Sequence, residues 1–354
     1  MKRFLAILTG RVGRVVLVIA ALTVLADLAV ERLGVRYCQP IGHEPTMAAW
    51  AYQHGARDLD AVFVGSSRIH FGVVPGTVEE AFRETTGREI RAWCLGVEAG
   101  TVMAYYPVVR DLLDGPRAPK VLVVGLSPRA VNSNSARNRL ALTYFGSPGD
   151  WWRECRIRGP WATDWRAIAS GVFGRPTALA QWAMVSGGYR AKQIRSIQDR
   201  RGGVHPPLGP DERVEDLPGA PSEDKWERLA AARLQFARDD LLRDFDIQGR
   251  ADHAFRRMAE AARARGIRMV AVNVPTHPTF DMGYKPGEYE TYIESMVRTC
   301  DELGVAWRDL NVAPFRSPDR DLWRDMDHMN RRGALRLSRL LGSDVLPEYL
   351  PPPE

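Results

Sequence analysis

Five short apolar segments constrain the fold of this chain more than any other feature of its sequence. Most of their residues are apolar, with Val, Ile and Leu common among them, and this is typical of strands that are covered on both faces of a parallel sheet. Amphipathic segments at 76–85, 100–113, 251–265 and 289–303 predict helices between and after them. This alternation predicts a doubly wound α/β sandwich around a parallel five-stranded sheet. The predicted strands are 61–64, 90–95, 121–126, 269–274 and 305–308.

The chain between the third and fourth predicted strands is much longer than a single crossover helix requires. We therefore predict a mainly helical insertion at 131–250, with a Gly- and Pro-rich loop at 202–221 followed by a helix at 225–245. The tryptophans at its beginning fit core packing, stacking on sugar rings or a place at the membrane interface, and these alternatives stay open. They are Trp151, Trp152, Trp161 and Trp165.

The N-terminus carries a membrane-targeting pattern. Residues 15–26 contain no charge, and the apolar segment extends to residue 30 if Asp27 is tolerated near its end. Basic residues precede this segment, so the positive-inside rule places the N-terminus in the cytoplasm and the rest of the chain across the membrane. This predicts a single-pass protein of the inner (cytoplasmic) membrane with a periplasmic or otherwise extracytoplasmic core. A cleaved signal peptide that ends near residue 26 is the alternative.

These features divide the chain into four parts. We predict a cytoplasmic tip and membrane anchor at 1–31, a connector at 32–57, a core made of 58–130 and 251–354, and the insertion at 131–250.

Charge and cysteine spacing exclude two classes of function. The chain has 49 Lys and Arg against 43 Asp and Glu, and four of the basic residues lie in its first fourteen positions. The remainder is nearly neutral, which argues against binding to nucleic acid. The four cysteines, Cys38, Cys94, Cys155 and Cys300, are too far apart for a zinc knuckle. We predict no metal and no cofactor; one or two disulfides and buried free thiols are both compatible with the sequence.

Polar residues follow several of the predicted strands, where the strand ends of a parallel sheet converge. Ser67 follows the first strand, and Asp325 and His328 lie together beyond the fifth. A serine hydroxyl needs a base within hydrogen-bond reach, and that base needs a carboxylate to orient it. We predict that Ser67 is a nucleophile, His328 its base and Asp325 the orienting acid, with Ser66 as the alternative nucleophile. Backbone N–H groups near Ser67, and that of Gly96 after the second strand, are the predicted oxyanion donors.

At these positions the chain resembles the SGNH (GDSL-like) hydrolase superfamily, over about 58–130 and 265–345. The segment 63–67, Phe-Val-Gly-Ser-Ser, looks like the first block of that superfamily, with Ser67 in the nucleophile position. The segment 95–100 resembles the second block through Gly96, and 325–328 fits the fifth, Asp-x-x-His. The resemblance implies a flavodoxin-like three-layer α/β/α sandwich and an acyl-enzyme mechanism.

The third block, Gly-x-Asn-Asp, is absent, and Gly-Leu-Ser-Pro-Arg stands at 125–129. We predict that Asn132 substitutes as side-chain oxyanion donor. Arg68 and Arg129 are candidates to bind an anionic substrate group, although structural arginines are more common. His70 and His277 are interpreted as packing or loop residues.

The N-terminal segment, the Gly-Ser-Ser-Arg form and the large insertion look most like the membrane-anchored branch of this superfamily, which includes the D-alanyl transfer protein and the alginate O-acetylation proteins. The resemblance implies a serine acyltransferase or esterase that acts on acyl groups, O-acetyl above all, of cell-envelope carbohydrate. Its partners would be an acyl donor, a carbohydrate acceptor and a multi-span membrane O-acyltransferase. The alternative is a catalytically inactive SGNH-like scaffold in envelope polysaccharide assembly.

Overall fold

The computed structural model describes residues 58–97, 100–113, 118–135, 137–138, 195–209 and 212–352, together with the isolated positions 14, 15, 18, 21, 22, 25 and 192. Its centre is one parallel sheet with the strand order β2-β1-β3-β4-β5. This is the order of flavodoxin-like doubly wound sheets. The strands are β1 (Ala61–Ser66), β2 (Ala92–Val97), β3 (Val121–Leu126), β4 (Arg268–Asn273) and β5 (Ala306–Asp309).

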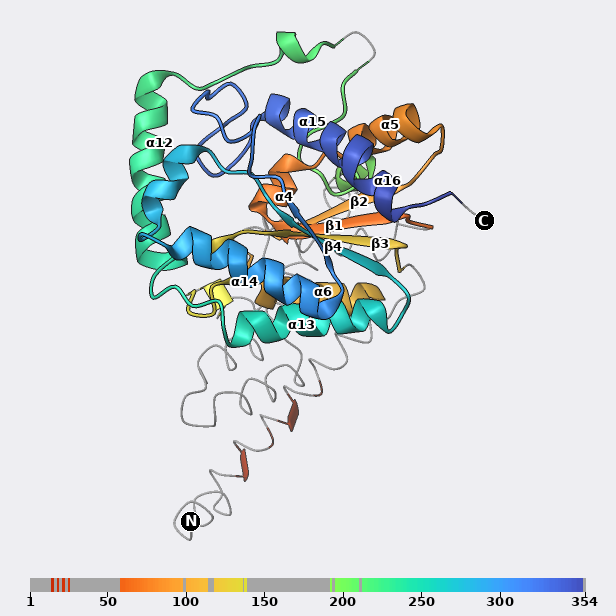
Figure 1. Cartoon of the computed structure of the whole chain (residues 1–354), viewed down its shortest axis with the longest axis vertical. Coiled ribbons are helices and arrows are strands. Elements are labelled where there is room, and N and C mark those ends of the chain that lie inside the picture. Colours follow the sequence, from red (N-terminus) through yellow and green to blue (C-terminus); the bar gives the residue numbers. More distant parts are fainter. Residues whose placement is uncertain are drawn as a thin grey trace.

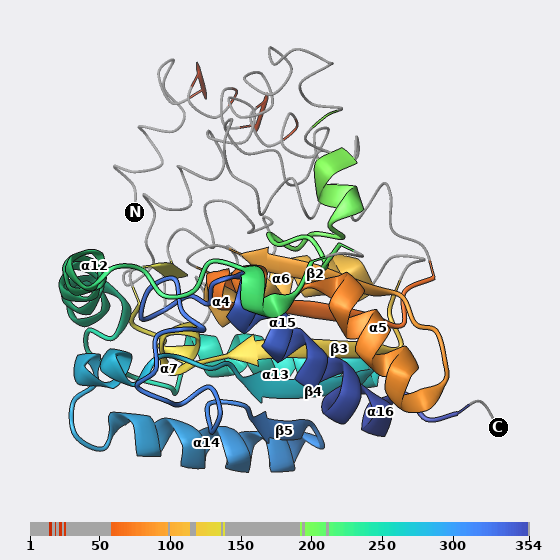
Figure 2. The same ribbon diagram turned by 90° about the horizontal axis from the view of Figure 1, so that it is seen from above.

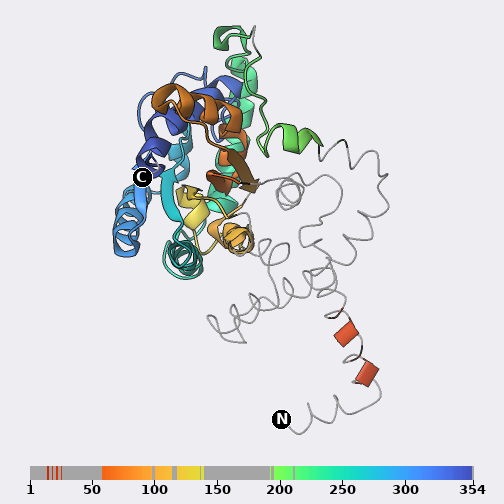
Figure 3. The same ribbon diagram turned by 90° about the vertical axis from the view of Figure 1, so that its right-hand side faces the viewer.

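Helices cover both faces of the sheet (Figure 1). One layer contains α4 (Ser67–Gly72), α5 (Pro75–Thr86), α15 (Arg331–Leu340) and α16 (Leu346–Tyr349). The other contains α6 (Val102–Leu113), α13 (Arg250–Arg263) and α14 (Glu288–Leu303). Figure 3 shows the sheet between the two layers from a second direction. The predicted α/β class and the parallel five-stranded sheet are therefore confirmed.

Alternate residues of each strand enter different cores. Val62 and Val64 of β1 belong to the core under α6, α13 and α14, whereas Ala61 and Phe63 belong to the core under α4, α5 and α15. All six residues of β1 are buried. Burial on both faces explains why apolar and polar residues do not alternate along β1, as the sequence pattern indicates.

Predicted element bounds agree with the structure to within a few residues. The segment 121–126 is β3 as predicted, whereas β1 extends two residues further, to Ser66, and β2 begins at Ala92 instead of residue 90. Helix α5 begins at Pro75, whose missing N–H costs nothing in the first turn, and ends at Thr86, followed by the C-cap Gly87 with a φ of 70°.

Three glycines allow α4 to lie directly on the sheet. A Cβ atom built on Gly96 would be 2.2 Å from Cβ of His70, and one built on Gly125 would be 2.2 Å from Cγ1 of Ile69. At Gly65 the corresponding distance to Cγ1 of Ile69 is 2.4 Å. Side chains at these positions would push α4 away, so the glycines fix the height of the helix above the strands.

The described C-terminal part of the insertion packs onto the core. It contains α12 (Glu223–Phe236), followed by a π-helical turn (Ala237–Leu241), so the predicted helix at 225–245 ends earlier than expected. Trp226 and Leu241 lie in the same hydrophobic cluster as Phe63 of β1. In Figure 2, α12 stands with α4 and α7 (Pro128–Val131) at the end of the sheet where the strands finish.

Several sequence predictions fall largely or wholly outside the described residues. These are the tryptophans at 151–165, Cys38, Cys155 and the predicted anchor at 15–30, of which only positions 15, 18, 21, 22 and 25 are described. Within the described part of the chain, no helix has the length and apolar character needed to cross a membrane. The two described cysteines, Cys94 and Cys300, are buried free thiols.

Candidate functional site

Ser67 is placed by an immediate transition from strand to helix. Ser66 is the last residue of β1 and the N-cap of α4, and Ser67 is the first residue of that helix. The Ser66 hydroxyl accepts a hydrogen bond from the backbone N–H of Arg68, at 3.3 Å. Because no loop separates β1 from α4, Ser67 is held at the carboxyl end of β1, which lies next to the edge strand β2.

His328 and Asp325 come from the segment between β5 and α15. Oδ1 of Asp325 accepts backbone N–H bonds from Asp327, at 2.8 Å, and from His328, at 2.9 Å. Nδ1 of His328 lies 3.0 Å from each carboxylate oxygen of Asp325. A carboxylate at Nδ1 holds the proton on that nitrogen, so Nε2 is left as an acceptor. Burial raises the pKa of Asp325, but the hydrogen bond and charge of His328, together with the backbone N–H of Asp327, outweigh burial and hold the pKa below its ordinary value.

The imidazole reaches the serine. Nε2 of His328 lies 2.8 Å from Oγ of Ser67, and both residues are 6% exposed. The structure thus brings Ser67, His328 and Asp325 into one chain of hydrogen bonds. This arrangement can take the proton from the Ser67 hydroxyl as its oxygen bonds to an electrophilic carbon.

The hydroxyl of Ser66, the alternative nucleophile, contacts two arginines. Its hydroxyl accepts from Arg68 N–H and, at 3.0 Å, from Nη2 of Arg129. The imidazole of His328 contacts Ser67 instead, so the geometry favours Ser67 over Ser66.

Two arginines share one buried carboxylate beside the serine. Nε of Arg68 donates to Oδ1 of Asp327 at 2.7 Å, and Nη1 of Arg129 donates to Oδ2 at 2.8 Å. The side chains of Asp327, Arg68 and Arg129 are 1%, 2% and 4% exposed. The second amino group of Arg129, Nη2, donates to Oγ of Ser67 at 3.0 Å. The guanidinium of Arg68 also stacks on Phe280, at 4.6 Å.

The charges of this cluster perturb one another. Burial raises the pKa of Asp327, but the charges of Arg129 and Arg68 reverse this effect and hold it far below its usual range. Burial lowers the pKa of Arg129, and the neighbouring Arg68 adds to that effect while Asp327 opposes it. In Arg68 the attraction of Asp327 and nearby tyrosines outweighs burial and raises the pKa. Both arginines, predicted as candidates to bind an anionic substrate group, therefore already have a carboxylate partner.

Asn132 does not have the position that the sequence prediction gave it. Its side-chain amide donates to the carbonyl oxygens of Leu241, at 2.9 Å, and Arg243, at 3.3 Å. Its oxygen accepts from the backbone N–H groups of Asn134 and Asp246. Both amide hydrogens are used to hold the segment after α12 against the end of α7, so the prediction of Asn132 as oxyanion donor is corrected.

Gly96 has a clear packing role. The atoms that a Cβ at Gly96 would meet belong to His70 of α4, at 2.2 to 2.6 Å. His70 is itself 3% exposed. Donation by the Gly96 N–H to an oxyanion stays a prediction.

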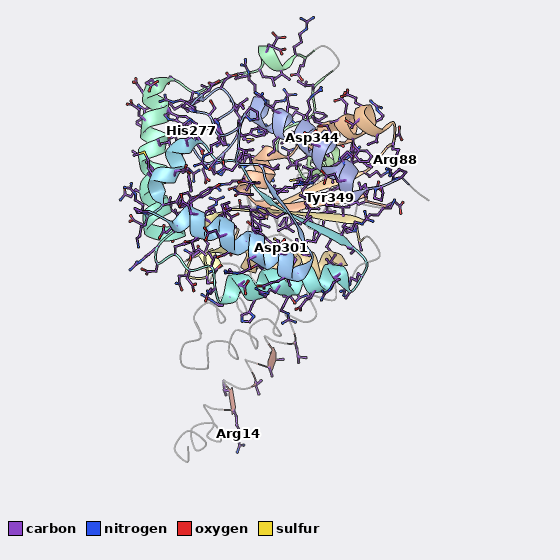
Figure 4. All side chains as sticks on the ribbon, in the orientation of Figure 1. Arg14, Arg88, His277, Asp301, Asp344 and Tyr349 are labelled. Atoms are coloured by element: carbon purple, nitrogen blue, oxygen red, sulfur yellow. The ribbon has the colours of Figure 1, made fainter. Side chains whose placement is uncertain are left out.

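His277 is a packing residue, as interpreted from the sequence. It lies beside α12 in Figure 4, with its ring 4.7 Å from that of Trp226 and 6.0 Å from that of Trp323. Its Nδ1 accepts the N–H of Thr279 at 3.2 Å and caps the short helix Pro278–Gly283.

Phe71 and Arg233 lie beside the pair formed by His328 and Asp325. The ring of Phe71 is 5.2 Å from that of His328, and the guanidinium of exposed Arg324 lies 4.9 Å above Phe71. From α12, Nη2 of Arg233 lies 3.9 Å from Oδ2 of Asp325. The described part of the insertion therefore extends to the edge of the site.

Asp327 is the residue that sequence reasoning missed. The sequence did contain a signal for it. Asp327 is an acidic residue next to His328, and two basic residues, Arg68 and Arg129, follow the neighbouring strands β1 and β3. A carboxylate buried at a strand edge requires cationic partners.

Among the described residues, no group of three or more His, Cys, Asp or Glu side chains is arranged to hold a metal ion. No protein-family model matches this chain, and no curated protein is similar to it.

Proposed function

We propose that this chain is an SGNH-type serine acyltransferase or esterase. The observation that carries the proposal is the 2.8 Å contact between Nε2 of His328 and Oγ of Ser67, with Asp325 bound to the other nitrogen of the same imidazole. Burial of all three side chains supports it, since a dry site strengthens the interactions that stabilise charge. The sequence order and the glycines at 65 and 96 fit the same class.

The proposed reaction runs in two halves. As Oγ of Ser67 bonds to the carbonyl carbon of an acyl ester or thioester, its proton passes to Nε2 of His328. The imidazolium formed is stabilised by Asp325 and by Asp327, whose Oδ2 lies 3.8 Å from Nε2. His328 then protonates the leaving group, which leaves an acyl-enzyme on Ser67. A carbohydrate hydroxyl or water then attacks this ester, His328 takes its proton, the bond between the acyl carbon and Oγ breaks, and His328 returns the proton to Oγ of Ser67.

The finer proposal is a membrane-anchored, extracytoplasmic enzyme that acts on O-acetyl groups of cell-envelope carbohydrate. Two sequence features support it, the basic residues before the apolar segment 15–30 and the resemblance of 63–67 and 325–328 to that branch of SGNH proteins. A multi-span O-acyltransferase would supply the acyl donor, and the insertion would provide the acceptor site.

The test uses the purified 354-residue chain in detergent, a fluorophosphonate probe and p-nitrophenyl acetate. We expect the probe to modify Ser67, identified by peptide mass spectrometry, and the variant Ser67→Ala to lose both labelling and turnover. Ser66→Ala is the matched control, because it removes the neighbouring hydroxyl and leaves Ser67 beside His328. No labelling and no turnover in the unaltered chain would favour the catalytically inactive scaffold.

Turnover with an added acceptor then separates transfer from hydrolysis. Acetylated acceptor oligosaccharides that increase at the expense of free acetate identify a transferase. Release of acetate that is independent of acceptor identifies an esterase.

A further inference from the structure

Arg129 makes a contact that its ion pair does not require. Nη1 donates to Asp327, whereas Nη2 points to the two serine hydroxyls, at 3.0 Å from each oxygen. The side chain is 4% exposed, so these bonds are made away from bulk water. A cation that served only to neutralise Asp327 would have no need to reach Ser67.

The donors and acceptors around Ser67 fix the direction of each hydrogen bond that its hydroxyl makes. A hydroxyl has one hydrogen and two acceptor positions. Its hydrogen goes to Nε2 of His328, which Asp325 keeps as an acceptor. Arg129 has only donors, so Oγ accepts from its Nη2. The hydroxyl therefore donates to the imidazole of His328 and accepts from the positively charged guanidinium of Arg129.

Such a bond becomes stronger as the reaction proceeds. A hydrogen bond with one ionised partner is about twice as strong as one between neutral groups, and Coulomb attraction strengthens it further when the other partner also gains charge. Oγ of Ser67 is neutral at rest and gains negative charge as its proton moves to His328, and the charge then passes to the carbonyl oxygen two bonds away. A donor beside Oγ therefore stabilises the transition state more than the resting enzyme, which is what catalysis requires.

The remaining contacts keep the guanidinium in place. Asp327 binds Nη1 at 2.8 Å, and Asp327 is itself held by Nε of Arg68 at 2.7 Å. Two arginines on one carboxylate leave one net positive charge in this buried cluster. Asn132 is not available for this role, since its side-chain amide donates to the carbonyl oxygens of Leu241 and Arg243.

We propose that Arg129 is a catalytic residue of this site, a charged donor that orients the Ser67 hydroxyl and stabilises the negative charge that develops on the reacting oxygens, with Asp327 as its positioning residue. This inference rests on the proposed function. In the step, the Oγ–H bond breaks, the proton goes to Nε2 of His328, the Oγ–C bond forms and the carbonyl π pair moves to the carbonyl oxygen. Arg129 keeps all its protons throughout.

The test compares Arg129→Ala with Arg68→Ala, because both remove one partner of Asp327 and only Arg129 donates to Ser67 among the contacts that the structure describes. We expect Arg129→Ala to lower kcat for p-nitrophenyl acetate by about 10²–10³-fold with little change in KM. Added guanidinium, at millimolar concentration, should restore part of this loss. Arg68→Ala should lose less activity, and guanidinium should not restore it.

Arg129→Lys covers the case in which Arg129→Ala does not fold. A lysine keeps the charge beside Asp327 but lacks the planar fork that binds Asp327 and Ser67 together, so kcat should still fall at least about tenfold. Equal losses in Arg129→Ala and Arg68→Ala without rescue, or Arg129→Lys at the unaltered rate, would overturn the role of Arg129. A chain whose Ser67 is never labelled overturns the proposed function and this inference together, whereas labelling of Ser67 that is independent of Arg129 overturns only the inference.

Discussion

Nε2 of His328 lies 2.8 Å from Oγ of Ser67, although 261 positions separate the two residues in the sequence. The strand order brings them together, because β1 lies inside the sheet and the segment after β5 crosses the carboxyl ends of the strands. Asp325 lies in the same segment and binds the imidazole, so four consecutive residues hold both the base and its carboxylate. The reactivity of the site should therefore depend on that short segment.

Asp325→Asn tests this dependence. The substitution preserves the shape of the segment but allows the amide to favour the wrong tautomer of His328, so we expect kcat for p-nitrophenyl acetate to fall by about 10⁴-fold. Asp321→Asn is the control, since Asp321 pairs with Arg332 near the surface and should leave kcat unchanged. A loss below about tenfold in Asp325→Asn, with the far-ultraviolet circular dichroism spectrum unchanged, would contradict the proposed role of Asp325.

Asp327→Ala should destabilise the fold. It leaves Arg68 and Arg129 buried without their carboxylate, and breaking a buried pair in this way costs about 3–5 kcal/mol. Glu212→Ala removes the exposed partner of Arg331 and should change the free energy of unfolding little. Urea unfolding of the two variants measures the difference. Similar midpoints for both would show that the buried arginines find other partners.

Gly96→Ala should disturb the site through packing alone. The new Cβ would lie 2.2 Å from Cβ and 2.6 Å from the backbone nitrogen of His70, so α4 must move, at a cost of about 1–3 kcal/mol. Because Ser67 begins this helix, its labelling by a fluorophosphonate should slow as well. Gly283→Ala is the control, since its nearest neighbour would be 3.5 Å away. Unchanged stability and labelling of Gly96→Ala would mean that α4 can shift freely.

His205 should make stability depend on pH. Burial, and then the charges of Arg331 and Arg324, lower its pKa from the usual 6.5 to about 4. The unfolded chain therefore binds more protons than the folded chain between these values, so the free energy of unfolding falls as the pH drops from 6.5 to 4. We expect His205→Asn to reduce this fall, measured by urea unfolding at pH 7, 5.5 and 4. An identical pH dependence in both proteins would exclude His205 as its source.

Asp325 and Asp327 extend the loss of stability to still lower pH. Their folded-state pKa values lie below the ordinary carboxyl value, so the stability they contribute is present above about pH 4 and is lost as the pH falls further. His205→Asn should therefore still unfold in strong acid.

The five strands, and the residues that follow them in the site, were predicted from the sequence. Short apolar segments located all five strands, because β1 and β3 are buried on both faces of the sheet and favour apolar residues throughout. The edge strand β5 is only partly buried. The residues at strand ends were equally readable, since parallel strands deliver Ser67 and Arg129 to one edge.

The contacts that sequence could not supply are those between distant side chains. The prediction of Asn132 was wrong because the end of the insertion returns to α7 and takes both hydrogens of its amide. The ion pair between Arg129 and Asp327 was not predicted, because the sequence does not show that Asp327 is buried beside Arg129. Both cases concern which of several nearby polar groups pair, and that choice depends on three-dimensional packing.

The distance along the chain between Ser67 and His328 also sets an order of events during synthesis. The strand and helix that carry the hydroxyl are made early, whereas the imidazole follows β5 and is anchored by α15, which packs on α4 and α5. A nascent chain therefore carries an ordinary alcohol with no base beside it. The proposed nucleophile gains its base only when α15 packs against α4 and α5, so the end of folding is the step that completes the proposed site.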